Sequence, residues 1–284
     1  MKRIESETFF DSCVHAYSRR CPAKILRLFV AKIKNISANE IVFHTNNLRF
    51  TPEEIAQLED FISRYESHEP VSKILNKRAF WNSDFFVNAD VLDPRSETEI
   101  IVEQTLKIFA KDQAFEFLDI GTGSGCILLS IAQEFPKSSG IGIDISEKAV
   151  SVALRNKSDM RVDNVEIQNV SWNDFAPQKK FDLIVSNPPY IKNADISDLD
   201  DNVKNFDPHI ALDGGTSGLD AYEQLSKLMK NWLKSNGKIL LEIGFDQFNA
   251  VKNIFESEGF IFENAFRDLQ KIPRILKFSL RNAI

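Results

Sequence analysis

Apolar residues in the first part of the chain recur with the 3.6-residue period of amphipathic helices. One such stripe comprises Ile25, Leu28, Phe29, Ile33 and Ile36. A second helix is predicted to begin at Thr51, which can cap it, with Pro52 in its first turn and Glu54 placed to close a capping box. Its apolar stripe comprises Ile55, Leu58, Phe61 and Ile62. Residues 1–75 are therefore predicted to form a small helical N-terminal domain.

From Glu97 onwards, short apolar runs alternate with helical stretches. The runs are centred on Phe117, Ile143, Ile167, Ile184 and Leu240. Strands that alternate with helices form a parallel sheet covered on both faces. Two more apolar runs, 260–262 and 275–278, lack an intervening helix, so their short connection predicts an antiparallel pair. We predict a doubly wound α/β domain over residues 96–284, with a mostly parallel seven-stranded sheet that ends in an antiparallel hairpin.

The stretch between these two domains is rich in aromatic residues. Residues 80–92 alternate in a strand-like manner around Phe85 and Val87, which indicates a short hairpin. We assign residues 76–95 to a hairpin linker.

A glycine-rich turn, Gly121-Thr122-Gly123-Ser124-Gly125, joins the first predicted strand of the sheet to the helix after it. Glycines let the chain turn tightly and let a ligand approach the backbone, next to the positive end of the helix. Nicotinamide enzymes use a similar loop for pyrophosphate, but Cys126 stands where their fingerprint has its third glycine. The loop alone therefore indicates a ligand site without identifying the ligand.

The second predicted strand, residues 140–144, ends in a carboxylate. Asp144 follows the glycine loop by about 20 residues, the position at which an acid accepts both hydroxyls of a ribose. An N-cap for the next helix is the alternative role for Asp144. The geometry suits any ligand that contains adenosine.

The fourth strand is followed by Asn187-Pro188-Pro189-Tyr190. The residues that precede the prolines are held extended, and the prolines carry no N–H, so backbone acceptors in this loop lack internal donors. The amide oxygen of Asn187 can accept one N–H of a planar NH2 group and the Pro188 carbonyl the other, while Tyr190 packs on its flat face. A rigid turn after a buried strand is the alternative interpretation.

These motifs together resemble the S-adenosylmethionine-dependent methyltransferases that modify glutamine N5 in peptide release factors. The resemblance also covers three other stretches, namely residues 80–99, 206–215 and 267–274. It extends from about residue 70 to the end of the chain, and the helical character of the first 70 residues fits the N-terminal domain of that family.

The chain departs from the family pattern at several positions outside the glycine loop, Asp144 and the Asn187 tetrapeptide. Asp93 replaces an aliphatic residue, Ser96 a proline and Asn76 a glycine, and Phe206-Asp207-Pro208 stands for Tyr-Glu-Pro. These departures bear on the linker geometry and leave the predicted chemistry unchanged.

The resemblance implies S-adenosylmethionine as cofactor and the glutamine of the Gly-Gly-Gln motif of peptide chain release factors as methyl acceptor. It implies that the glycine loop, Asp144, Trp172 and Asn187 hold the cofactor, with Trp172 against the adenine. It further implies that Asn187, Pro188, Pro189 and Tyr190 bind the acceptor and that Asn187, Pro188 and Tyr190 promote transfer. An ordinary packed tryptophan is the alternative for Trp172. Glu242, Arg95 and Glu99 are secondary candidates, with structural roles favoured for Arg95 and Glu99.

Composition narrows the class further. The net charge of −6 argues against a broad phosphate-binding surface, so we expect no direct sequence-specific nucleic-acid binding. Residues 1–40, however, contain eight basic residues and only four acidic ones. The basic residues are Lys2, Arg3, Arg19, Arg20, Lys24, Arg27, Lys32 and Lys34. They indicate either a solvated helix face or a patch that steers an acidic or RNA-associated partner.

The cysteines, the histidines and the hydropathy of the chain argue against a metal-binding protein and against a membrane protein. Cys13, Cys21 and Cys126 form no C-x-x-C pair, and the four histidines lack ligand spacing, so we expect no metal site. No apolar stretch is long enough for a membrane span or a signal core, and we expect a cytoplasmic protein without membrane contact.

Several alternatives remain open. The same motifs occur in glutamine methyltransferases that act on a ribosomal protein and in N6-adenine or N2-guanine methyltransferases of nucleic acids. A nicotinamide oxidoreductase is disfavoured by the Asn187 tetrapeptide and the terminal hairpin. A non-catalytic nucleoside-binding adaptor is disfavoured by the complete set of binding residues.

Overall fold

The computed structural model describes residues 8–9, 15–44 and 48–281. The chain divides into two compact units, Met1–Lys77 and Arg78–Ile284. The stretch from residue 78 onwards that we assigned to a linker is thus part of the second unit. No helix in the described ranges is both long and apolar enough to cross a membrane.

The first unit is mainly helical. Its helices are α2 (Ala23–Lys34), α3 (Ala38–His44), α4 (Pro52–Glu66) and α5 (Val71–Leu75), and its strands β1 (Thr8–Phe9) and β2 (Arg49–Phe50) form an antiparallel pair. The capping box is confirmed: the Thr51 hydroxyl accepts from the Glu54 N–H, and Glu54 accepts from the Thr51 N–H.

The packing of α2 differs from the predicted stripe. Leu26, Phe29 and Val30 are fully buried, whereas Leu28 is half-buried. The buried face therefore lies one position to the side of the predicted one, against Leu58 and Ile62 of the same core. The apolar period placed the helix correctly but left the choice between Leu26 and Leu28 to tertiary contacts.

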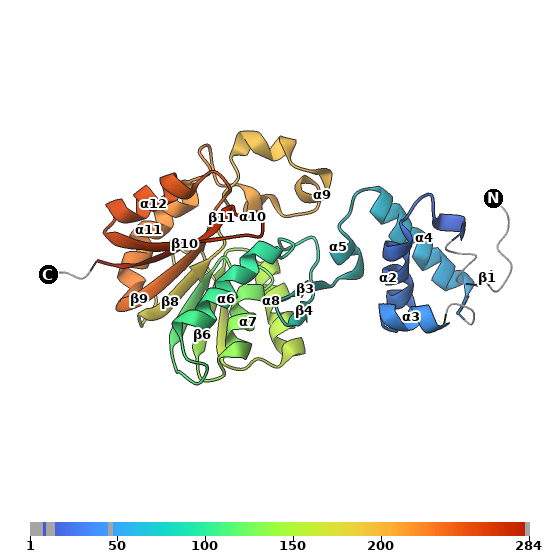
Figure 1. Ribbon diagram of the computed structural model, residues 1–284, viewed down its shortest axis with the longest axis horizontal. Coiled ribbons are helices and arrows are strands. Elements are labelled where there is room, and N and C mark those ends of the chain that lie inside the picture. Colours follow the sequence, from blue (N-terminus) through green and yellow to red (C-terminus); the bar gives the residue numbers. More distant parts are fainter. Residues whose placement is uncertain (1–7, 10–14, 45–47, 282–284) are drawn as a thin grey trace. The chain divides into compact units, whose positions relative to one another are not determined.

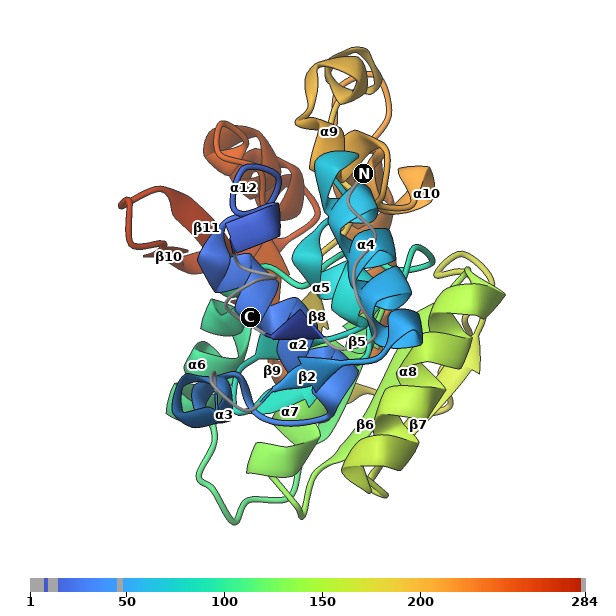
Figure 2. The same cartoon turned by 90° about the vertical axis from the view of Figure 1, so that its right-hand side faces the viewer.

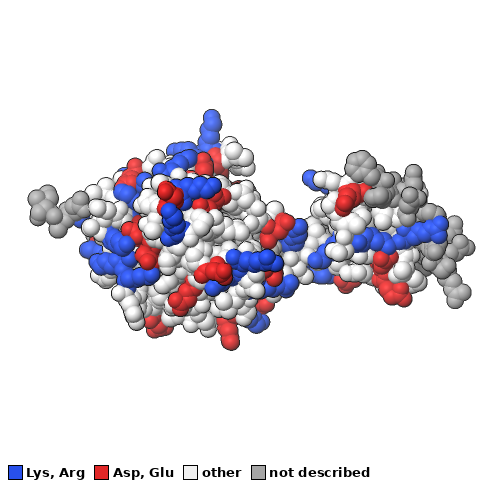
Figure 3. Space-filling model, turned by 90° about the horizontal axis from the view of Figure 1, so that it is seen from below, with Lys and Arg blue, Asp and Glu red and all other residues white. Residues whose placement is uncertain are grey.

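Several basic residues of this unit are already paired. Arg20 forms ion pairs with Glu59 at 2.8 Å and Glu66 at 2.7 Å, and Lys34 pairs with Glu54. Figure 3 shows a row of Lys and Arg side chains across one face of the unit, with Asp and Glu beside it. Lys2, Arg3 and Cys13 lie outside the described residues.

Two departures from the family pattern have a structural explanation. Asn76 ends α5 in the left-handed conformation with φ of 52°, which glycine adopts freely and asparagine tolerates best among other residues. Asp93 lies 3.5 Å from Arg78, measured between Oδ2 and a guanidinium nitrogen. Asparagine can thus take the backbone conformation at position 76, and the carboxylate at position 93 has a cationic partner.

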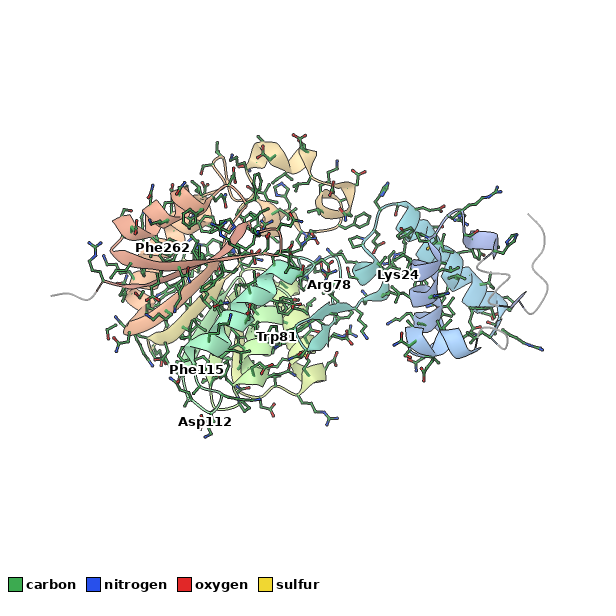
Figure 4. The ribbon with its side chains drawn as sticks, in the orientation of Figure 1. Lys24, Arg78, Trp81, Asp112, Phe115 and Phe262 are labelled. Atoms are coloured by element: carbon green, nitrogen blue, oxygen red, sulfur yellow. The ribbon has the colours of Figure 1, made fainter. Side chains whose placement is uncertain are left out.

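The second unit begins with a hairpin of β3 (Arg78–Phe80) and β4 (Ser83–Phe85). The hairpin starts two residues earlier than predicted, and residues 86–92, including Val87, form no strand. Trp81 lies at the turn of the hairpin (Figure 4). It donates its indole N–H to Glu134 and its backbone N–H to Glu99. These bonds fasten the hairpin to two helices of the same unit.

The seven-stranded sheet has the order β10-β11-β9-β8-β5-β6-β7. Its strands are β5 (Glu116–Ile120), β6 (Ser139–Asp144), β7 (Val165–Asn169), β8 (Phe181–Ser186), β9 (Leu233–Glu242), β10 (Phe260–Arg267) and β11 (Pro273–Leu280). The first five are parallel, and β11 pairs antiparallel with both β9 and β10. The predicted strand centres and the terminal hairpin are confirmed.

Helices cover both faces of this sheet (Figure 1). One cluster of buried residues joins the sheet to α6 (Glu99–Ile108) and α7 (Cys126–Glu134), and α8 (Glu147–Met160) contacts β6 and β7. A second cluster joins the sheet to α11 (Asp220–Trp232) and α12 (Phe248–Ser257). Cys126 is buried in the first cluster, where it packs as a small apolar residue.

The prediction of a helix between every pair of parallel strands was wrong at one place. Residues 170–180, between β7 and β8, contain only turns. Phe175 anchors this segment against Trp232 with ring centroids 5.4 Å apart. This ring contact holds residues 170–180 against the rest of the unit, so an irregular segment connects β7 to β8 without a helix. Pro177 within it also disfavours a helix.

A long excursion connects the end of β8 to α11. It contains the short helices η2 (Asn193–Asp198), α9 (Asp201–Lys204) and α10 (His209–Leu212). Two views place α9 and α10 beyond one end of the strands (Figures 1 and 2). Asp207 fixes the excursion to the segment between β4 and α6. Its carboxylate accepts a hydrogen bond from the Arg95 guanidinium at 2.9 Å and one from the Asp93 N–H at 3.2 Å.

Candidate active site

The glycine loop joins β5 to α7. Gly121, Gly123 and Gly125 have φ values of 70°, 55° and 80°, a region that other residues rarely adopt. The N–H groups of Gly121 and Thr122 both donate to the Ile143 carbonyl, which fixes the loop to the end of β6. A Cβ at Gly121 would meet no atom within 4 Å, so the space above the loop is open to a ligand.

The two residues between these glycines, Thr122 and Ser124, are buried and hydrogen-bonded to neighbouring elements. Thr122 is buried and donates its hydroxyl to Asp119 at 2.7 Å, and Ser124 is buried while its carbonyl accepts from Asn156. Burial raises the pKa of Asp119 to about 7. Neither Thr122 nor Ser124 lines either of the two cavities described below, and their predicted part in cofactor binding stays a prediction.

Asp144 lies at the end of β6, opposite the loop. One carboxylate oxygen accepts from the Gly123 N–H and the other from the Ser146 N–H, both at 2.9 Å. The helix that follows is capped by the Ser146 side chain, so the alternative role of Asp144 as N-cap is wrong. Burial raises the pKa of Asp144, and the two backbone N–H groups oppose that shift. The carboxylate is thus fixed in orientation, with its remaining lone pairs available.

A first cavity opens between these two elements. Its walls include Gly121, Gly123, Asp144, Ile145, Trp172 and Pro189. Trp172 is held in place by an N–H bond from its indole to Gln224 at 2.9 Å. The cavity joins a glycine loop, a fixed carboxylate and an indole ring, which is a suitable set for a nucleoside.

A second cavity lies next to the first. Its walls include Pro188, Tyr190, Arg95, Glu97, Glu242 and Arg274. Asn187 lines both cavities, as do Leu92 and Ala211. Within the tetrapeptide, Pro189 faces the first cavity while Pro188 and Tyr190 face the second. The tetrapeptide is therefore part of the wall that separates them.

Asn187 is oriented by a buried network. Its Nδ2 donates to the Thr98 hydroxyl at 3.3 Å, and that hydroxyl donates to Glu242 Oε2 at 2.6 Å. When Glu242 is ionised, the single hydroxyl hydrogen of Thr98 is used on its carboxylate, so the Thr98 oxygen accepts from Asn187. In that state the amide nitrogen of Asn187 faces Thr98. None of the described residues donates to its Oδ1 or to the Pro188 carbonyl.

Glu242 is fully buried at the end of β9. Burial raises its pKa to about 7, against the opposing effects of the Thr98 hydroxyl, Arg274 and Asn187. Tyr190 is half-buried, and burial raises the pKa of its phenol. Both groups line the second cavity, which accordingly combines acceptors, a neutral phenol and an aromatic face.

The secondary candidates have mainly structural contacts. Arg95 pairs with Asp207, and Glu99 accepts from the Trp81 backbone at the start of α6. Thr98 was not predicted, although it directly precedes α6, because its contact with Asn187 joins residues far apart in sequence. Arg274 was also missed; it lies in the stretch that resembles the family but carries no motif of its own.

The residues fit the predicted cofactor. Asp144 suits the ribose diol, the open space at Gly121 suits close approach to the backbone, and Trp172 suits the adenine. No group of three or more His, Cys, Asp or Glu side chains in the described ranges could hold a metal ion.

Comparisons with known proteins agree with this site. A family model described as a methyltransferase domain matches residues 111–262. A release factor glutamine methyltransferase of Caulobacter vibrioides is 38% identical over 257 residues, which cover 90% of this chain and 88% of that protein. A release factor glutamine methyltransferase of Rhodospirillum rubrum is 40% identical over 255 residues, which cover 90% of this chain and 78% of that protein.

The fold has counterparts among solved structures. A methyltransferase from Pyrococcus furiosus superposes with a TM-score of 0.51 at 19% identity, covering 80% of this chain and 97% of that one. This likeness confirms the predicted methyltransferase fold. The matches together confirm the predicted enzyme class and S-adenosylmethionine as its methyl donor. The chain belongs to the family of release factor glutamine methyltransferases.

Proposed function

We propose that this protein methylates the side-chain amide nitrogen of the glutamine in the Gly-Gly-Gln motif of peptide chain release factors. The observation that carries the proposal is that Asn187 lines both the cavity suited to a nucleoside and the cavity that contains Pro188 and Tyr190. An acceptor held by Asn187 in the second cavity therefore lies next to the first. Family membership supports the choice of substrate.

S-adenosylmethionine, when bound, supplies a methyl group on a positively charged sulfur. The first cavity would hold it through the backbone of the glycine loop, the Asp144 carboxylate and the indole of Trp172. These groups orient the donor and exclude water from its flat parts.

In the second cavity, the acceptor amide is a poor nucleophile because its nitrogen lone pair is delocalised into the carbonyl. Asn187 Oδ1 and the Pro188 carbonyl each accept one N–H of that amide, and both are free of other donors among the described residues. These bonds strengthen as positive charge develops on the nitrogen. When the bond between the nitrogen and the methyl carbon forms, the bond from that carbon to sulfur breaks, and the nitrogen then loses one of its two protons to water. Tyr190 packs on the planar face. Holding the reacting atoms about 3–3.5 Å apart and in line supplies most of the rate.

Two further assignments belong to this proposal. The helical first unit, our predicted domain 1–75, recognises the protein substrate away from the reacting glutamine. The protein acts in the cytoplasm, where translation ends. Neither assignment requires nucleic-acid binding, in keeping with the net charge of −6.

The test is a labelling experiment with the purified protein and S-adenosylmethionine that carries a radioactive methyl group. Release factors, ribosomal proteins and nucleic acids are offered separately, and a release factor whose motif glutamine is replaced by alanine is the matched control. Label on the wild-type release factor, absent from the alanine control, supports the proposal. Label confined to a ribosomal protein or to nucleic acid overturns the substrate assignment.

A further inference from the structure

Gln247 is a buried residue that contacts the back of the tetrapeptide loop. Its Nε2 donates to the Tyr190 carbonyl and to the Gly218 carbonyl, each at 2.9 Å. Its Oε1 accepts from the Gly244 N–H at 2.9 Å and from the Tyr222 hydroxyl at 3.3 Å. Both N–H donors of the amide are therefore used, and its oxygen accepts firmly from Gly244, because the one hydrogen of the Tyr222 hydroxyl also lies within reach of the Glu242 carbonyl at 3.0 Å.

The backbone of Tyr190 has little freedom to move towards the interior. A Cβ at Gly214 would lie 2.7 Å from Tyr190 Cα, and a Cβ at Gly218 would lie 2.6 Å from the Tyr190 oxygen. The chain next to Tyr190 is tied to the same turn, since the Ile191 N–H donates to Leu212 and the Ile191 carbonyl accepts from Gly214. The absence of side chains at Gly214 and Gly218 thus lets the Tyr190 backbone lie close to both glycines. Among the described residues, only Gln247 donates a hydrogen bond to the Tyr190 carbonyl.

We propose that Gln247 is a positioning residue for methyl transfer, which holds the Tyr190 carbonyl and thereby fixes the acceptor side of the tetrapeptide. The inference rests on the proposed function for the identity of the acceptor. Gln247 itself does not line either cavity. It acts by keeping the Tyr190 ring and the Pro188 carbonyl at a constant separation from Asn187, because all three belong to one short, proline-stiffened loop.

The isosteric variant Gln247→Glu separates this role from general support of the fold. A carboxylate can still accept from the Gly244 N–H and from the Tyr222 hydroxyl, which it shares with the Glu242 carbonyl, but it donates no hydrogen bond. The Tyr190 and Gly218 carbonyls therefore lose their partner and face a negative charge. The variant therefore loses the hydrogen bonds to the Tyr190 and Gly218 carbonyls and can keep those from Gly244 and from Tyr222 of α11. Gln178→Glu, at an exposed glutamine, is the matched control.

Three measurements on the full chain decide the matter. Calorimetry should give a Kd for S-adenosylmethionine within about twofold of wild type, while turnover on the acceptor that wild type labels falls on the order of 100-fold. Hydrogen exchange at the Ile191, Asn193 and Gly214 amides should become on the order of tenfold faster.

Unchanged exchange at these amides overturns the proposal, whatever happens to turnover. So does a variant that loses cofactor affinity and folded stability together with turnover, because Gln247 would then support the whole unit. If wild type labels a ribosomal protein instead of a release factor, the proposed substrate is wrong, yet the exchange measurement still decides the role of Gln247.

Discussion

Thr98 and Glu242, 144 positions apart in sequence, share one short hydrogen bond of 2.6 Å between hydroxyl and carboxylate. When Glu242 is ionised, the only hydroxyl hydrogen of Thr98 bonds to its carboxylate, so the Thr98 oxygen accepts from the Asn187 amide. This relationship decides which end of the Asn187 side chain faces the second cavity. It also yields predictions that do not depend on which protein carries the target glutamine.

Replacing Asn187 with alanine should lower turnover on the order of 100-fold or more, because the acceptor amide loses one of its two anchors. The Kd for S-adenosylmethionine should change by no more than about threefold, since Gly121, Gly123 and Asp144 remain. Single-turnover kinetics and calorimetry check the two quantities. Asn193→Ala, at an exposed asparagine nearby, serves as control. Equal losses in both quantities would contradict the role assigned to Asn187.

Thr98→Val should leave the Asn187 amide free to rotate and deprive Glu242 of its donor. We expect turnover to fall on the order of tenfold, and the unfolding free energy to drop by about 1–3 kcal/mol for the buried carboxylate left without its bond. Thr98→Ser keeps the hydroxyl and should restore most of the turnover. A serine variant as slow as the valine variant would show that the methyl group, and not the hydrogen bond, is what matters.

Glu242 gives a pH-dependent contribution to stability. Burial raises its pKa from 4.5 to about 7, so the folded protein binds this proton more tightly than the unfolded chain. The contribution is therefore fully present below about pH 4.5 and is lost as pH rises to about 7, which amounts to roughly 3 kcal/mol.

The variant Glu242→Gln removes this titration. It should unfold at a higher temperature than wild type at about pH 8, and the advantage should vanish near pH 4.5. Its turnover should fall, because a neutral amide no longer dictates how Thr98 and Asn187 orient. Calorimetric unfolding at several pH values measures the first effect. A constant difference across the whole pH range would mean that Glu242 is not the titrating group.

Asp144→Ala should weaken S-adenosylmethionine binding on the order of 10- to 100-fold, because the ribose diol loses a charged acceptor worth about 1.5–3 kcal/mol. The loop also loses its bond from the Gly123 N–H. Asp163→Asn, at an exposed aspartate next to β7, is the control. Calorimetric titration with S-adenosylmethionine provides the comparison, and an unaltered Kd would place the ribose elsewhere.

The capping box of α4 allows a prediction for the first unit alone. Thr51→Ala should destabilise that unit by about 1 kcal/mol, since the Glu54 N–H loses its acceptor, whereas Thr51→Ser should be nearly neutral. Local hydrogen exchange in residues 52–66 reports the difference. If the alanine variant exchanges at the wild-type rate, the cap does not limit the stability of α4.

The sheet could be predicted from the sequence because its five parallel strands are short apolar runs, each beside a turn signal. The convergence of the glycine loop, Asp144 and Asn187 also followed, because the carboxyl ends of parallel strands meet at one edge. The structure places all three at the first cavity. Their roles in binding stay predictions.

Other parts of the site depend on contacts that no local pattern reveals. Thr98 looks like an ordinary residue at a helix start until the fold brings Glu242 beside it. Gln247 looks like an ordinary residue before α12 until the fold brings the Tyr190 and Gly218 carbonyls beside it. The short helices of the excursion and the β1–β2 pair contain too few residues to produce a period. The irregular crossing at residues 170–180 depends on Phe175 finding Trp232, a tertiary contact.

The excursion between β8 and α11 has an evolutionary consequence. Leu199 and Val203 of this segment line the second cavity and not the first, whereas Pro208, Ile210 and Ala211 at its far end line the first. Insertions or exchanges within residues 193–207 can thus reshape the second cavity while the residues around the first cavity are inherited unchanged. Divergence of client choice among related enzymes should accordingly concentrate in this one stretch of chain.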